Sequence, residues 1–176
     1  MNFNNKQGIS DKVYYWLATR YQTDNDSIKR MLDNQVATVY LLIWPIMEQE
    51  IFSGFMKKEQ IKPMASRYVQ YYAELNVENI AKHFHTRYQD EERYRHLCHQ
   101  DNYKDTDEIL LKPYENITHK EKIILLTYVV YRYRNNIFHG NKGIRTWSNY
   151  NKQIQYCLQY MMAIVDCHER HEEENA

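Results

Sequence analysis

Apolar residues recur along this chain at intervals of three and four positions, the spacing that places them on one face of an α-helix. Short polar segments between these runs are typical of helix ends and helix starts. The pattern predicts helices over residues 10–21, 28–55, 60–75, 77–98, 118–139 and 148–171. Residues 99–117 are acidic and contain Pro113, and we expect them to form a loop. We expect a single domain over residues 1–176, with flexible ends at 1–9 and 170–176.

The predicted helix that starts at Thr118 has the clearest boundaries. Thr118 and Glu121 have the spacing of a capping box, in which each side chain accepts a hydrogen bond from the backbone N–H of the other residue. The apolar run from Ile123 to Tyr131 follows. Gly140 then suits the left-handed conformation that ends many helices. We therefore predict a buried helix whose C-terminal end carries the polar residues that precede this glycine.

Composition favours helices over strands. The chain of 176 residues contains only 4 Gly and 3 Pro, too few for the turns of a many-stranded sheet, so we predict an all-α fold. No apolar run is long enough to cross a bilayer, and no signal peptide is apparent. The 3 cysteines, an odd number, suit a reducing compartment. We expect a cytoplasmic protein that does not associate with membranes.

Charge is distributed unevenly although the chain as a whole is neutral, with 23 basic and 23 acidic residues. Between Thr118 and Tyr160 basic side chains predominate, and Glu121 is the only acidic residue in that stretch. A local positive field attracts an anionic substrate such as RNA and supplies phosphate contacts. A solvated basic helix surface would have the same composition, and charge alone does not separate these two interpretations.

Three polar residues gather before the predicted helix end. Asn135 and His139 are i, i+4 neighbours on one helical face, and Arg134 is adjacent to Asn135. A guanidinium, an amide and an imidazole in one place are suited to binding and cleaving a phosphodiester. The structural alternative is that basic side chains in a last turn offset the helix dipole, and that Asn is common where a helix gives way to a loop.

Residues 131–143 resemble a known family motif. Arg134-Asn135, followed by three residues and His139 and then by Gly140, is similar to the signature of the HEPN (higher eukaryotes and prokaryotes nucleotide-binding) domain family. The resemblance implies an up-and-down helical bundle of four core helices with accessory helices. It also implies a homodimer and, in the active branch, metal-independent RNA cleavage by the Arg and His of the motif, with Asn135 as a third catalytic residue. No cofactor is expected.

The implied reaction is attack of the RNA 2′-hydroxyl on the adjacent phosphorus, which leaves a 2′,3′-cyclic phosphate. Histidine titrates near neutral pH and can move the protons, and Arg134 can bind the phosphate oxygens as their charge grows. We expect the substrate to be contacted by further basic and amide side chains, namely Arg132, Asn136, Lys142 and Arg145. A role as a toxin or antiviral effector, with a regulatory or antitoxin protein as partner, is open. One toxin branch carries a tyrosine two residues after the motif histidine, and here that residue is Asn141.

Two other interpretations bear on the site. The chain could be a non-catalytic helical module that binds a nucleotide, RNA or protein partner, as in inactive branches of the family. The remaining His and Cys residues form no familiar metal motif, although Cys167 and His171 are spaced i, i+4. We therefore expect no metal site.

Overall fold

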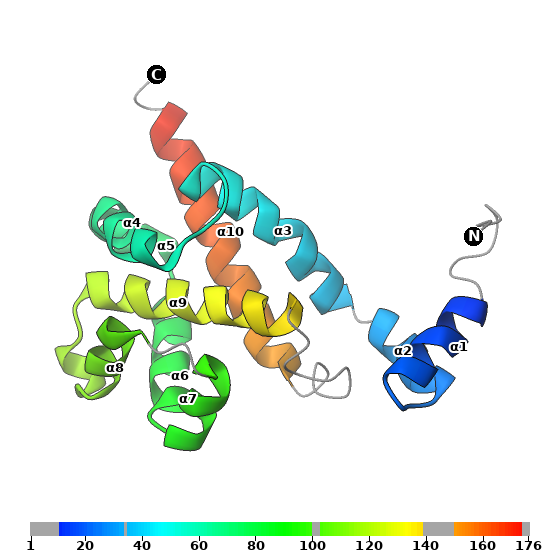
Figure 1. The fold of residues 1–176 in the computed structure, drawn as a ribbon. Helices are drawn as coiled ribbons and strands as arrows, with labels where there is room; N and C mark the ends of the chain where they lie inside the picture. The colour runs from blue at the N-terminus through cyan, green and yellow to red at the C-terminus, as the bar shows by residue number, and fades with distance from the viewer. Residues whose placement is uncertain (1–10, 34, 100–102, 139–149, 174–176) are drawn as a thin grey trace.

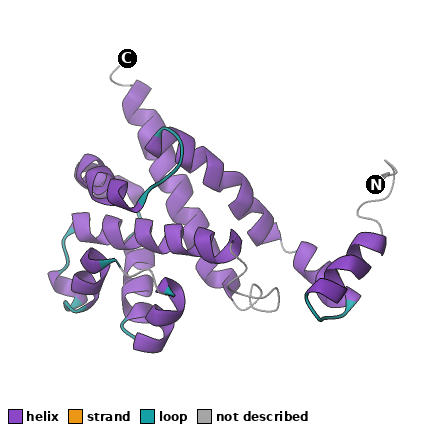
Figure 2. Ribbon diagram, in the orientation of Figure 1, coloured by secondary structure: helices purple, strands orange, loops and turns teal. Residues whose placement is uncertain are grey.

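The computed structural model describes residues 11–33, 35–99, 103–138 and 150–173. Within these ranges the regular elements are α-helices and short 3-10 helices, and no strand is present (Figure 2). The prediction of an all-α fold is confirmed. None of the helices in the described ranges combines the length and the apolar character that a bilayer-spanning segment needs.

Two short helices at the N-terminal side form a hairpin. α1 (Asp11–Arg20) packs against α2 (Asn25–Leu32), and the pair stands apart from the other helices in Figure 1. Asp24 caps α2, because its carboxylate accepts a hydrogen bond from the backbone N–H of Ser27 at 2.7 Å. The second helix of the hairpin therefore has a capped start of its own.

The longest predicted helix is interrupted. We expected one helix over residues 28–55, but α2 ends at Leu32 and a separate helix, α3 (Gln35–Phe52), follows. Asp33 lies at the break, and an aspartate side chain competes for backbone hydrogen bonds and so disfavours a helix interior. α3 continues through Pro45 and packs along α10 (Asn151–Glu173), the most extensive helix pair in the described fold (Figure 1).

The predicted helix over residues 60–75 is also divided. The short 3-10 helix η1 (Lys58–Gln60) leads into α4 (Ile61–Tyr68), and η2 (Val69–Tyr71) leads into α5 (Tyr72–Leu75). Asn76 has a left-handed backbone with φ of 50° and ends α5. Asparagine tolerates this conformation better than most residues, which suits it to end a helix.

The next segment contains more helices than we predicted. The expected helix over residues 77–98 is two helices, α6 (Glu78–Tyr88) and α7 (Glu91–Cys98), because Asp90 caps α7 by accepting from the backbone N–H of Arg93 at 2.9 Å. The expected loop over residues 99–117 contains α8 (Lys104–Leu110) and η3 (Tyr114–Asn116). Thr106, Ile109 and Leu110 of α8 are buried, which explains why an acidic segment folds as a helix.

α9 (His119–Phe138) is the central helix. Its predicted capping box is confirmed, since Thr118 N donates to Glu121 Oε2 at 2.8 Å and Glu121 N donates to Thr118 Oγ1 at 3.3 Å. Every residue from Lys122 to Val130 is buried. α4, α6, α7, α8 and α10 all pack on it. α9 therefore positions its C-terminal residues against most of the fold.

α10 extends beyond the point at which we expected a flexible tail. It continues to Glu173, so residues 170–173 are helical. Arg170 and His171 on this last stretch both lie near Glu74 of α5, at 3.8 Å and 3.1 Å. These contacts attach the end of α10 to the preceding part of the chain.

Candidate active site

The end of α9 presents Arg134 and Asn135 in half-buried positions. Arg134 Nη1 donates a hydrogen bond to Asn135 Oδ1 at 3.1 Å, so the first two expected catalytic side chains are in contact. The guanidinium carbon of Arg134 also lies 5.7 Å from the ring centroid of Trp44, which is buried in α3. This cation–π contact links the last turns of α9 to α3.

A second link between the same two helices lies one turn earlier. The hydroxyl of Tyr40 on α3 donates to the backbone oxygen of Val130 at 2.8 Å, and Tyr40 is fully buried. Burial raises the pKa of Tyr40 well above its ordinary value, so this phenol stays protonated and keeps its donor. Tyr40 and Trp44 of α3 therefore both contact the C-terminal part of α9, at Val130 and at Arg134.

Arg132 and Asn136, which we expected to contact the substrate, point into the protein. Arg132 donates to the backbone oxygens of Leu97 at 3.2 Å and Cys98 at 2.7 Å, and Asn136 Nδ2 donates to Leu97 at 3.0 Å. These oxygens belong to the last turn of α7, whose carbonyls have no partner within their own helix. Arg132 and Asn136 donate the hydrogen bonds that these carbonyl oxygens would otherwise lack. Both side chains are buried, so their role here is to hold α9 against α7.

The remaining expected site residues lie outside the described part of the chain. His139, Lys142 and Arg145 fall within residues 139–149, which directly follow the last described residue of α9. Of the expected catalytic residues, the structure therefore brings Arg134 and Asn135 together, and His139 is outside the described residues.

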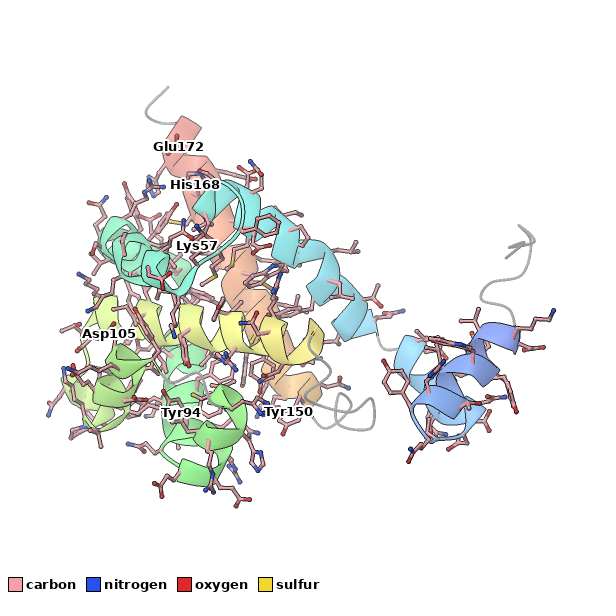
Figure 3. All side chains as sticks on the ribbon, in the orientation of Figure 1. Lys57, Tyr94, Asp105, Tyr150, His168 and Glu172 are labelled. Carbon is pink, nitrogen blue, oxygen red and sulfur yellow. The ribbon has the colours of Figure 1, made fainter. Side chains whose placement is uncertain are left out.

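A basic and aromatic cluster that we did not predict lies where α10 begins. The guanidinium carbon of Arg87 on α6 is 5.9 Å from the ring centroids of both Tyr88 and Tyr150. Tyr150, labelled in Figure 3, meets Tyr133 of α9 in an edge-to-face contact with 6.1 Å between ring centroids. Arg87 therefore reaches, from another helix, the side of the fold where α9 ends and α10 starts.

Lys152 adds a second positive charge near Arg87 and His83. The pKa of His83 on α6 is lowered by burial and then by the charges of Lys152 and Arg87. Arg87 Nε is buried and has no hydrogen-bond partner among the described residues. The sequence did not indicate Arg87 as a site residue, because it is far from the motif in sequence. Only the packing of α6 against α9 brings Arg87 to this side of the fold.

Buried phenols beneath this cluster provide packing and no general base. Tyr88 donates its hydroxyl hydrogen to the Tyr133 hydroxyl at 3.1 Å, and burial raises the pKa of Tyr133 well above its ordinary value. A phenol with a raised pKa does not give up its proton near neutral pH. Tyr133 therefore keeps its proton near neutral pH.

Comparison with models of known protein families, with curated proteins and with solved structures gives no match. The functional assignment therefore depends on the side chains themselves. Away from the end of α9, the described residues also include a cluster of metal-ligating side chains, Glu74, Cys167 and His171.

Proposed function

We propose that this protein is a metal-independent endoribonuclease of the HEPN type, with Arg134, Asn135 and His139 as its catalytic residues. The observation that carries the proposal is the position of the motif at the end of α9. Arg134 and Asn135 lie there in mutual contact and partly exposed, while their neighbours Arg132 and Asn136 turn inward. In this proposal the largely buried helix α9 positions these two residues of the motif for a substrate.

In the proposed reaction an imidazole accepts the proton of the 2′-hydroxyl as its oxygen attacks phosphorus. A second protonated group donates to the 5′-oxygen as the phosphorus–oxygen bond breaks, which leaves a 2′,3′-cyclic phosphate. The planar guanidinium of Arg134 can donate two hydrogen bonds to the phosphate oxygens in the transition state. Asn135, which already accepts from Arg134, keeps that guanidinium oriented.

A second copy of the chain would complete this chemistry, because one chain supplies a single motif histidine. Two copies related by a two-fold axis provide two imidazoles and two guanidinium groups in one composite site. The protein's proposed partners are therefore RNA and its own second copy. Three buried free thiols are in keeping with a reducing compartment such as the cytoplasm.

The test is cleavage of a mixed RNA pool in the presence of a metal chelator. His139→Ala and Arg134→Ala should each lower the rate by roughly 10² to 10⁴ fold, and the products should carry a 2′,3′-cyclic phosphate. His96→Ala is the matched control, because His96 is an exposed histidine on α7. A folded His139→Ala protein that cleaves as fast as wild type would exclude the proposal.

One observation favours a second candidate, a non-catalytic HEPN-like module that binds RNA or a protein partner. Arg134 already contacts Asn135 and Trp44 within the protein, as a structural residue would. In that case wild type has no RNase activity, and Arg134→Ala lowers stability or partner affinity. The same set of variants therefore distinguishes the two functions.

A further inference from the structure

The end of α10 and the short helix α5 bring together three side chains of different metal-binding types. Cys167 and His171 are i, i+4 on α10 and share one helical face, and Glu74 reaches them from α5. Their ligand atoms all lie within 4.8 Å of one another. Glu74 Oε2 and His171 Nε2 are 3.1 Å apart. A thiol, an imidazole and a carboxylate thus converge from two separate elements.

The separations of these ligand atoms approach those of a tetrahedral zinc site. Zinc binds sulfur at about 2.3 Å and nitrogen or oxygen at about 2.0–2.2 Å, which places the ligand atoms of a tetrahedral site roughly 3.3–3.8 Å apart. Glu74 and His171 are already near this separation. A small side-chain rotation would bring the Cys167 sulfur in, since none of the three ligand atoms is more than 4.8 Å from another.

The choice of ligands selects the metal. Thiolate and imidazole favour zinc over magnesium or calcium, which prefer oxygen ligands. Zn²⁺ bound to a thiolate, a carboxylate and a neutral imidazole forms a neutral group, which suits a site where Cys167 is buried and Glu74 is exposed. Binding releases the thiol proton of Cys167 to solvent and requires the His171 proton to sit on Nδ1.

Neighbouring side chains orient one ligand and oppose the charge of the metal. The ring of His171 stacks on Tyr71, with 3.7 Å between centroids and an interplanar angle of 17°, and this fixes its plane. Arg170 lies 3.8 Å from the Glu74 carboxylate and competes for it. His168 is not one of the proposed ligands, because its Nδ1 is hydrogen-bonded to the hydroxyl of Tyr68 at 2.9 Å.

We propose that Glu74, Cys167 and His171 bind Zn²⁺, with water in the fourth position, and that the ion joins α5 to the last turns of α10. The site lies at the opposite end of α10 from Tyr150, near the labelled residues His168 and Glu172 in Figure 3. Its proposed role is therefore structural, and it is independent of RNA cleavage at the end of α9.

Cobalt provides a direct test, because Co²⁺ occupies zinc sites and gives a near-ultraviolet charge-transfer absorption only when a thiolate is a ligand. Titration of the full chain with Co²⁺ should produce this absorption, and excess Zn²⁺ should remove it. Cys167→Ser should abolish the signal. Cys157→Ser and Cys98→Ser are matched controls, since both cysteines are buried elsewhere, and each should retain it.

Two further variants keep the test decisive if Cys167→Ser does not fold. Glu74→Gln and His171→Ala change partly exposed side chains, and each should weaken Zn²⁺ binding by about tenfold or more in competition with a chromogenic chelator. Arg170→Gln should tighten binding, because it removes the competing cation. Absence of the charge-transfer signal in wild type, or its loss in Cys157→Ser alone, would overturn the proposal.

Discussion

Lys122 on α9 and Glu78 at the start of α6 form an ion pair, with Lys122 Nζ 2.8 Å from Glu78 Oε1 and 3.0 Å from Oε2. The Lys122 side chain is only 10% exposed. The hydroxyls of Tyr72 and Tyr114 each donate to the same carboxylate at 2.7 Å. This network attaches the N-terminal half of α9 to α6, and Glu78 has enough donors to remain ionised there.

Acid should weaken this network over a defined pH range. Burial raises the pKa of Glu78, but donation by Lys122, Tyr114 and Tyr72 outweighs it and lowers the pKa from 4.5 to about 2. A carboxyl whose pKa is lower in the folded state stabilises the fold fully above pH 4.5, and this contribution is lost as the pH falls towards 2. We expect Glu78→Gln to show a smaller loss of stability over that range than wild type, as measured by urea denaturation. If the stability of Glu78→Gln fell with pH as steeply as that of wild type, Glu78 would not be the group responsible.

Arg132 and Arg134 should respond differently to replacement although they are two residues apart. Arg132→Ala leaves buried carbonyls at the end of α7 without donors and should cost roughly 3 kcal/mol of the free energy of unfolding. Arg134→Ala removes the cation–π contact with Trp44 and the part-buried hydrogen bond to Asn135 and should cost about 1 kcal/mol. Urea denaturation of both variants checks this order, and a larger loss for Arg134→Ala would contradict it.

The proposed homodimer has a candidate surface on α3. Val39, Leu42 and Ile46 recur at i, i+3 and i+7, and Leu42 and Ile46 are 65% and 49% exposed. The same helix contacts the end of α9 through Tyr40 and Trp44. We expect Leu42→Glu to shift the protein from dimer to monomer in light scattering. Leu111→Glu, at a leucine that is 86% exposed on another surface, is the control and should not.

Arg87 should contribute to RNA affinity and not to the chemical step. Its guanidinium lies beside Tyr150 in a positive cluster, where it can bind phosphate. Arg87→Ala should weaken RNA binding and reduce the slope of log affinity against log salt by about 1, with little change in the single-turnover rate at saturation. Arg93→Ala is the control, since Arg93 is exposed on α7 and 3.7 Å from Asp90. Equal effects of the two variants would exclude a specific role for Arg87.

The sequence predicted local features well where a physical signal is local. The Thr118–Glu121 capping box and the continuous apolar run after it define α9, and the structure confirms both. The breaks at Asp33 and Asp90 were missed because apolar residues recur on both sides of each aspartate, so helical spacing continues through the break. The helix at Lys104–Leu110 was missed because its acidic composition concealed a small buried face.

The sequence relates polar residues to one another only as far as one helix extends. The spacing of Arg134 and Asn135 is a property of α9 alone, whereas the inward direction of Arg132 depends on where α7 ends. Arg87 and Glu74 come from other helices, and no spacing in the sequence connects them to their neighbours. A single sequence gives no information on such tertiary proximity.

Two of the contacts that anchor α9 lie ten residues apart, at Lys122 through Glu78 and at Arg132 through the end of α7. An α-helix turns by about 100° per residue, so one residue inserted between these anchors would rotate every later side chain by that angle. No rotation of α9 would then satisfy both anchors, and Arg134 would leave its place beside Trp44. This helix therefore tolerates changes of side chain far better than changes of length. The contacts of Lys122 and Arg132 determine the rotation of α9 about its axis, and both residues precede Arg134.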